Sequence, residues 1–239
     1  MDYEVMMNGN VKIGQYAPEF EANSTMGILK LSDYKGKWLV LFSHPGDFTP
    51  VCTTEMIAFA KANTYFNERN TCLLGLSVDS NNSHLAWVYD IFCRTGIKIP
   101  FPIIADRNAT IARKYGMISS SIDNAETVRN VYIIDNCGII RAILAYPMTI
   151  GRCIPEILRI IDAAQTADCS KGATPANWCP GSPIIVPMPT TFNGLEKRVS
   201  EIHKNQNGMS WYLSFKEPQE YCKRDIEEEK KEVDKKKEK

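Results

Sequence analysis

The strongest constraint on the fold is an apolar run that ends in a turn and leads directly into a helix. Residues 38–42 are all apolar and span the length of a strand, which predicts a buried strand. Pro45 and Gly46 then interrupt the pattern, and apolar residues recur afterwards at helical spacing. Thr49 is the expected N-cap and Pro50 the first helical residue. This order predicts a helix that starts where a buried strand ends.

The same alternation continues along the chain and then stops. A four-residue turn at 135–138 separates two apolar runs and indicates a hairpin. Further strands are expected at 72–78, 103–104, 131–134 and 139–144, and helices at about 85–96, 108–115 and 155–164. Strands that alternate with helices before a terminal hairpin predict an α/β fold with a mixed central sheet flanked by helices. After about residue 167, repeated prolines indicate an extended arm, followed by a helix at 194–205 and a short strand at 211–215.

Charge and composition exclude several classes of partner. The chain has 28 basic and 28 acidic residues, so no net field attracts nucleic acid or an anionic membrane. Its apolar runs are shorter than the roughly 20 residues that cross a bilayer. Its first residues, 1–4, lack the basic and apolar regions of a signal peptide. We therefore expect a cytoplasmic protein that binds neither nucleic acid nor membrane.

The cysteines are scattered rather than paired. The chain has eight of them and no C-x-x-C, far below the density of a disulfide scaffold. The three histidines lie far apart in the sequence and no zinc-type spacing is present. We expect no metal and no cofactor, and one or two reactive thiols among otherwise idle ones.

Cys52 is the candidate for the reactive thiol. It falls in the first turn of the expected helix, where unpaired N–H groups and the helix dipole favour a thiolate. Thr49 lies three residues earlier, and its hydroxyl either faces whatever approaches the sulfur or simply caps the helix. Glu55 lies one turn later, and its charge disfavours a neighbouring thiolate unless a cation compensates it. The pattern therefore requires an arginine from elsewhere in the chain.

Two arginines occupy unusual positions. Arg129 begins an otherwise apolar strand, and Arg152 precedes a helix, where the dipole disfavours a positive charge. An exposed surface arginine is the alternative reading for each. His44, at the end of the first strand, is either a base for Cys52 or a packing residue.

The small size of the possible gain from thiolate formation restricts the kind of reaction that Cys52 can accelerate. An ordinary thiol with a pKa of about 8.5 is roughly 3% thiolate at pH 7. Lowering a thiol pKa to about 6 raises that fraction roughly thirtyfold, while the nucleophilicity falls about tenfold. The net gain is only a few-fold, so a large acceleration must come from donors that bind the developing charge. Arginines and a threonine hydroxyl suit a small polar electrophile such as a peroxide.

These residues carry a family resemblance. The segment Pro45-x-x-x-Thr49-x-x-Cys52 resembles the active-site signature of the peroxiredoxins, and the longer run 43–55 is similar to the one-cysteine, or peroxiredoxin-six-like, branch. The similarity continues through 76–79, 100–106, 128–135, 146–148 and 151–159, and covers roughly residues 10–190. It implies a thioredoxin-like fold with an extended C-terminal dimerisation domain, and a thiol-specific peroxidase acting on hydrogen peroxide and small organic hydroperoxides.

The resemblance also implies roles for single residues. Cys52 is the expected peroxidatic cysteine, which attacks the O–O bond and becomes a sulfenic acid. Thr49 is expected to hydrogen-bond the peroxide and Pro45 to shield the sulfur. Arg129 is expected to bind thiolate and peroxide, with Arg152 in support. Two further positions have lesser expected roles: Glu55, which pairs with an arginine, and His44, which is typical of the branch.

The sequence departs from the family in two places. Lys37 stands where some members carry the serine of a lipase-like element, so we expect no phospholipase activity. Ser214 stands where long-armed members often carry a resolving cysteine. Cys222 is the nearest thiol downstream, so either Cys222 resolves the sulfenic acid or an external reductant, thioredoxin-like or a small thiol, does so.

The resemblance divides the chain into three segments: a thioredoxin-like peroxidase domain at 8–167, a C-terminal peroxiredoxin domain or arm at 168–223, and a charged tail at 224–239 that is disordered or a frayed helix. It implies a homodimer and, beyond it, a decamer of dimers. The proline-rich arm and the tail keep one alternative open, a peroxide-triggered redox sensor or chaperone-like oligomer. The missing C-x-x-C disfavours a disulfide oxidoreductase.

Overall fold

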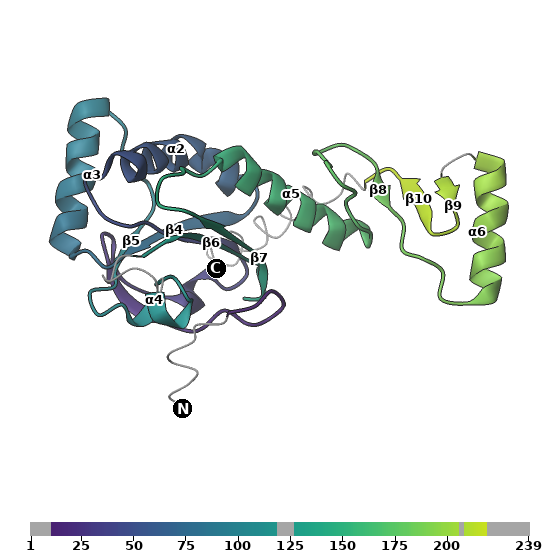
Figure 1. Ribbon diagram of the computed structural model, residues 1–239, viewed down its shortest axis with the longest axis horizontal. Coiled ribbons are helices and arrows are strands. Elements are labelled where there is room, and N and C mark those ends of the chain that lie inside the picture. The colour runs from purple at the N-terminus through teal and green to yellow at the C-terminus, as the bar shows by residue number, and fades with distance from the viewer. Residues whose placement is uncertain (1–10, 119–126, 206–207, 219–239) are drawn as a thin grey trace, which may run out of the picture. The chain divides into compact units, whose positions relative to one another are not determined.

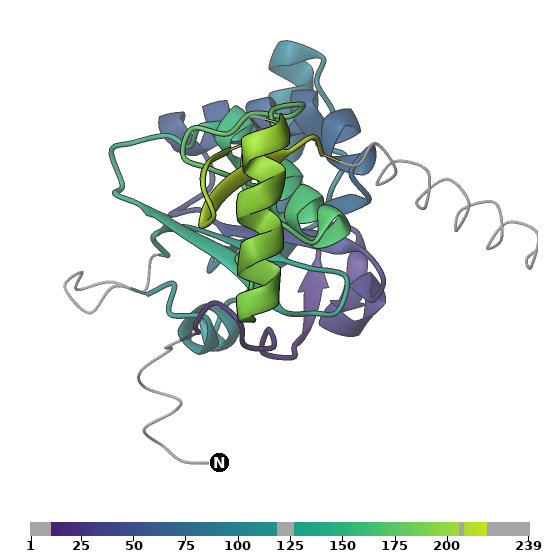
Figure 2. The same cartoon turned by 90° about the vertical axis from the view of Figure 1, so that its right-hand side faces the viewer.

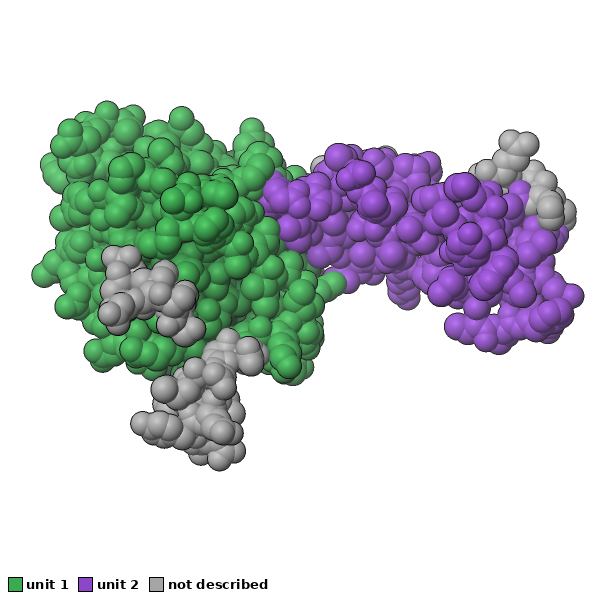
Figure 3. All heavy atoms as spheres, viewed as in Figure 1, with its two compact units in different colours: residues 1–155 green, residues 156–239 purple. Residues whose placement is uncertain are grey.

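The computed structural model describes residues 11–118, 127–205 and 208–218 (Figure 1). The chain forms two compact units, residues 1–155 and residues 156–239 (Figure 3). The boundary at residue 167 that the sequence suggests stays a prediction. Cys222 and the charged tail at 224–239 lie outside the described residues.

Unit 1 contains a seven-stranded sheet in the order β2-β1-β5-β4-β3-β6-β7. Its strands are β1 (Glu21–Ser24), β2 (Gly27–Lys30), β3 (Trp38–Ser43), β4 (Thr71–Ser77), β5 (Ile103–Ala105), β6 (Arg129–Ile134) and β7 (Ile140–Tyr146). The three strands β3, β4 and β5 are parallel to one another, and the remaining pairings are antiparallel. The predicted mixed sheet and the β6–β7 hairpin are therefore confirmed.

Helices cover both faces of this sheet (Figure 1). They are η1 (Leu31–Tyr34), α2 (Pro50–Asn67), α3 (Asn81–Thr95) and α4 (Thr110–Lys114). A further helix, α5 (Ile154–Ser170), begins at the end of unit 1 and belongs mostly to unit 2. Leu39 and Leu41 belong to the core that packs against α4, whereas Phe42 stacks on Phe59 of α2, with ring centroids 4.2 Å apart. All six residues of β3 are buried, which explains why this strand is a continuous apolar run.

Unit 2 is more structured than an extended arm. Besides α5 it contains β8 (Ile184–Ile185), α6 (Phe192–Asn205), β9 (Gly208–Ser210) and β10 (Leu213–Lys216). The strands form a small sheet in the order β8-β10-β9, and α6 lies beside β9 (Figure 2). The helix expected at 194–205 is confirmed. The strand expected from Trp211 begins only at Leu213, because the two aromatic residues before it form the turn after β9.

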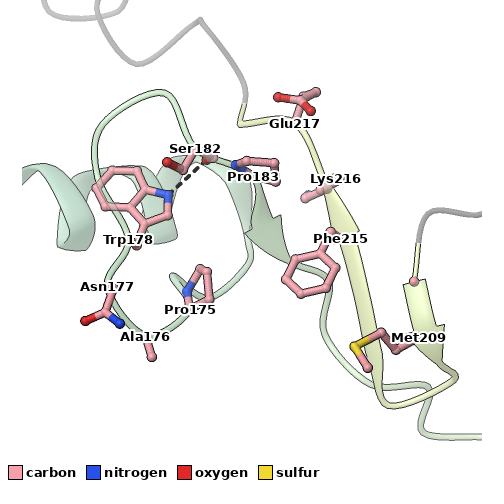
Figure 4. Close-up of a pocket in the computed structure, with 11 residues that line it drawn as sticks. Pro175, Ala176, Asn177, Trp178, Ser182, Pro183, Met209, Phe215, Lys216 and Glu217 are labelled. Atoms are coloured by element: carbon pink, nitrogen blue, oxygen red, sulfur yellow. Dashed lines mark hydrogen bonds between the residues drawn. The ribbon is translucent and has the colours of Figure 1, made fainter.

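A cavity of about 780 Å³ lies within unit 2 (Figure 4). Its lining includes Pro175, Trp178, Met209 and Phe215. The indole nitrogen of Trp178 donates to the carbonyl oxygen of Ser182 at 2.9 Å, which closes the turn at residues 178–182. Within the described ranges, no helix is both long and apolar enough to cross a membrane.

Candidate active site

The site forms where β3 ends and α2 begins. Thr49 occupies the N-cap position with an extended backbone, and Pro50 is the first helical residue, as predicted. Cys52 follows in the first turn and is completely buried. The strand fixes one end of the connecting loop and the helix fixes the other, so the thiol is held against the end of the sheet.

Arg129 is the cation that Glu55 requires. Its Nη1 lies 3.2 Å from Cys52 Sγ and 2.8 Å from Glu55 Oε2, and its Nε donates to the carbonyl oxygen of Met148 at 3.0 Å. Arg129 and Glu55 are both almost completely buried. A surface role for Arg129 is therefore wrong, because one guanidinium nitrogen touches both the thiol and the carboxylate.

Arg152 completes the same cluster from the chain segment before α5. Its backbone N–H donates to Glu55 Oε1 at 2.9 Å, and its Nε lies 3.2 Å from the same oxygen. Its Nη2 donates to the carbonyl oxygen of Ser43, and its guanidinium lies 5.3 Å from the ring centre of Phe42. Burial lowers the pKa of Arg152 to about 10, although Glu55 opposes this change. The guanidinium thus stays charged at neutral pH, and one carboxylate holds two buried arginines.

Thr49 points its hydroxyl into the loop. The side chain makes no capping hydrogen bond; its Oγ1 instead donates to the carbonyl oxygen of Gly46 at 2.9 Å. Thr49 therefore occupies the N-cap position, but the alternative that its side chain caps the helix is wrong. Because the hydroxyl proton is used, its oxygen lone pairs remain to accept a hydrogen bond. Pro45, in the same loop, is buried.

His44 joins a buried cluster that the sequence did not predict. Its Nε2 lies 3.0 Å from Asp47 Oδ1, and His84 Nδ1 lies 2.8 Å from Asp47 Oδ2. Although His44 and His84 lie far apart in the sequence, α3 places His84 beside the loop, so both rings contact Asp47. His84 precedes the helix expected at about 85–96, so no local pattern indicated this contact.

The cluster has unusual proton affinities. Burial lowers the pKa of His44, and the charges of His84 and Arg152 lower it further. The hydrogen bond to Asp47 and the charge of Asp47 act in the opposite direction. Burial alone would raise the pKa of Asp47, but the hydrogen bonds from His44 and His84 hold it below its ordinary value. Ligand-type atoms of these three side chains lie within 4.8 Å of one another, so the cluster has the composition of a metal site as well as of a hydrogen-bonded triad.

The other free cysteines among the described residues are Cys72, Cys93, Cys137, Cys153 and Cys179. Cys72 is half-buried and the rest are exposed, whereas Cys52 is completely buried. Ser214, which stands where the resemblance led us to expect a resolving cysteine, is buried, and its hydroxyl donates to the carbonyl oxygen of Ser210 at 3.2 Å.

Together these residues make a buried sulfur nucleophile with cationic N–H donors around it. A guanidinium that contacts the sulfur stabilises a thiolate and can also bind an oxygen that gains negative charge. Such a site suits the cleavage of a polarisable bond between two electronegative atoms.

Comparison with known families points to the same chemistry. Residues 13–143 match the AhpC/TSA family, and residues 163–201 match the C-terminal domain of 1-Cys peroxiredoxin. "Peroxiredoxin 2" of Caldanaerobacter subterraneus subsp. tengcongensis is 58% identical over 205 residues, which cover 86% of this chain and 92% of that protein. "Peroxiredoxin" of Aquifex aeolicus is 50% identical over 216 residues, covering 86% and 96%.

Solved structures agree with these sequence matches. A yeast mitochondrial 1-Cys peroxiredoxin superposes with a TM-score of 0.76 at 39% identity, over 87% of this chain and 99% of that one. A cysteine-to-serine mutant of the Peroxiredoxin 6 of Arenicola marina superposes with a TM-score of 0.77 at 34% identity, over 88% and 100%. Both carry the thioredoxin-like fold with a C-terminal extension.

Proposed function

The chain belongs to the peroxiredoxins of the AhpC/TSA family, and on that premise we propose how its residues share the peroxidase reaction. The protein is a thiol peroxidase that reduces hydrogen peroxide and small organic hydroperoxides at Cys52. The Cys52 thiolate attacks one peroxide oxygen and forms an S–O bond as the O–O bond breaks. The second oxygen leaves with the electron pair, takes a proton and departs as water or an alcohol. Cys52 is left as a sulfenic acid.

In our proposal Arg129 stabilises both ends of this step. The supporting observation is that its Nη1 lies 3.2 Å from Cys52 Sγ. The same donor can follow the charge as it moves from sulfur to the leaving oxygen, which stabilises the transition state. Glu55 holds this guanidinium in place through the 2.8 Å contact and holds Arg152 as well.

Thr49 and Pro45 orient and protect the reactants. Because the Thr49 hydroxyl donates to Gly46, we propose that its oxygen accepts a hydrogen bond from the protonated peroxide oxygen. Pro45 is buried in the loop and lacks an N–H, so it can exclude water from the sulfur without adding a competing donor. His44 acts in support.

Replacement of the thiol tests the assignment. Cys52→Ser should abolish hydrogen peroxide consumption with dithiothreitol as reductant. Cys137→Ser, which removes an exposed thiol from the β6–β7 turn, is the matched control and should retain the rate. Peroxide consumption by Cys52→Ser at the wild-type rate would refute the assignment.

For recycling, we propose two routes that one experiment separates. The yeast mitochondrial 1-Cys peroxiredoxin is resolved through glutathione and thioredoxin systems, which supports an external thiol here. The alternative is Cys222 of a second subunit. After one equivalent of hydrogen peroxide, a non-reducing gel should show a dimer that Cys222→Ser abolishes if Cys222 resolves; a monomer whose sulfenic acid reacts with dimedone would support the external thiol.

We further propose the assembly, layout and location. The match to a 1-Cys C-terminal domain supports a homodimer, with a decamer of dimers beyond it, and the division at 8–167, 168–223 and 224–239. Similarity to peroxiredoxins of bacteria and archaea supports a cytoplasmic location. A peroxide-triggered holdase is the second candidate; prevention of citrate synthase aggregation without sustained turnover would favour it over the peroxidase cycle.

A further inference from the structure

The loop between β3 and α2 is held by residues from other elements. The backbone N–H of Asp47 donates to Asp79 Oδ2 at 3.0 Å, and Asp79 in turn accepts from the Ser77 hydroxyl at 2.8 Å. The Asp47 side chain, which is 2% exposed, accepts from His44 and from His84. Hydrogen bonds at Asp47 therefore anchor the loop to the segment after β4 and to helix α3.

The contacts of His84 define the hydrogen bond that it donates to Asp47. Its Nδ1 lies 2.8 and 3.0 Å from the two oxygens of Asp47, and its Nε2 lies 3.2 Å from the carbonyl oxygen of Ile104. A carboxylate only accepts, and a bare ring nitrogen this close would place its lone pair against an oxygen lone pair. Nδ1 therefore carries a proton and donates to the Asp47 carboxylate.

The same hydrogen-bond argument assigns the proton of the His44 ring. Its Nε2 must donate to Asp47 Oδ1, and with one proton on a neutral ring its Nδ1 is unprotonated. That nitrogen is buried and has no hydrogen-bond partner among the residues that the structure describes. The His84–Asp47 pair thus determines which nitrogen of His44 carries the proton.

Two short chains of contacts connect this pair to Cys52. Asp47 adjoins Gly46, whose carbonyl oxygen holds the Thr49 hydroxyl. The ring of His44 lies 5.2 Å from that of Trp87, whose Nε1 donates to Thr53 Oγ1 beside Cys52. Phe48, which lies between Asp47 and Thr49 in the sequence, has a positive φ of 57°. Such a strained conformation persists only where the surroundings impose it.

We propose that His84 is a positioning residue for the peroxidase reaction: through the hydrogen bond from its Nδ1 to Asp47, it fixes the loop that carries Thr49 and the proton of His44. The inference rests on the proposed role of Thr49 at Cys52. His84 itself touches neither the thiol nor the peroxide site, so its effect on the rate passes through Asp47.

A metal ion is the competing explanation for two histidines and a carboxylate. A ligating imidazole must be unprotonated at the ligating nitrogen. The ring-to-carboxylate distances of 2.8–3.0 Å are instead those of N–H···O bonds. The hydrogen-bonded triad therefore accounts for the geometry without an ion.

Two amide variants separate positioning from simple stability. Asparagine at position 84 places its amide nitrogen near that of Nδ1 and keeps the donor to Asp47. Glutamine places its amide nitrogen near that of Nε2 and keeps the donor to Ile104. Each variant loses one of the two contacts of the buried His84 ring, so urea unfolding should show similar losses of stability.

The peroxidase rates of these variants should differ. In single-turnover stopped flow at 25 °C, His84→Asn should retain the rate constant for hydrogen peroxide within about threefold, whereas His84→Gln should lose about tenfold to a hundredfold. Equal rate losses, or losses that follow stability alone, would overturn the proposal.

A measurement on the wild type keeps the proposal testable if the glutamine variant does not fold. Nitrogen-15 NMR should show His84 Nδ1 protonated and His44 Nδ1 unprotonated. An unprotonated His84 Nδ1, or one equivalent of zinc or iron in the purified protein, would overturn the proposal. Because this spectrum does not depend on Cys52 turnover, its failure is distinguishable from failure of the peroxidase assignment.

Discussion

Replacement of Glu55 by glutamine tests whether position or charge controls the reactivity of Cys52. Glu55 is 4% exposed and contacts Arg129 at 2.8 Å and Arg152 at 2.9 and 3.2 Å. Removing the charge leaves two buried guanidinium groups without their shared anion. Loss of one partner from a buried ion pair costs about 3–5 kcal/mol, and we expect the free energy of unfolding to fall by this amount.

Two opposite effects on the rate follow from this substitution. Loss of a negative charge beside the sulfur favours the thiolate, but the loss in nucleophilicity limits that gain to a few-fold at most. Loss of the anchor lets Arg129 move from its position near the sulfur, and a displacement of about 1 Å costs up to a hundredfold. The positional effect is larger, so we expect a net decrease of at least tenfold.

The assay is the single-turnover rate constant of Cys52 with hydrogen peroxide at pH 7, in buffer without denaturant. Glu68→Gln is the matched control, because Glu68 is an exposed glutamate at the other end of α2 and its loss should change neither rate nor stability. A Glu55→Gln rate equal to or above that of the wild type would refute the reasoning, because it would show that charge outweighs position.

Two further predictions concern the loop. Thr49→Val removes the hydroxyl that contacts Gly46 and should lower kcat/KM for peroxide by about tenfold, whereas Thr49→Ser should retain it; equal values in steady-state assays of both variants would exclude the hydroxyl. His44 has a pKa below its unfolded value, so the stability that it contributes is complete above about pH 6.5 and is lost as the pH falls below that value. Urea unfolding between pH 8 and pH 5 should show this decrease, and His44→Phe should weaken it; a stability independent of pH in this range would contradict the buried neutral imidazole.

Local pattern was sufficient for much of the fold. The strand at 38–42, the helix that starts at Pro50 and the β6–β7 hairpin were predictable because periodicity and turn residues act over only a few positions. In unit 2 the same reasoning was weaker. The aromatic pair Trp211 and Tyr212 suits a strand by composition, but the turn that joins β9 to β10 uses these residues instead.

The sequence by itself determined that Cys52 begins a helix and that Glu55, one turn away, requires a cation. Only the tertiary structure decided which cation, because Arg129 is 77 residues away and reaches the sulfur through the pairing of β6 with β3. It also joined His84 to Asp47 across 37 residues. The physical reason is range: helix starts and caps depend on neighbours in the chain, whereas the charges around a buried thiol are brought together by the packing of the sheet and its helices.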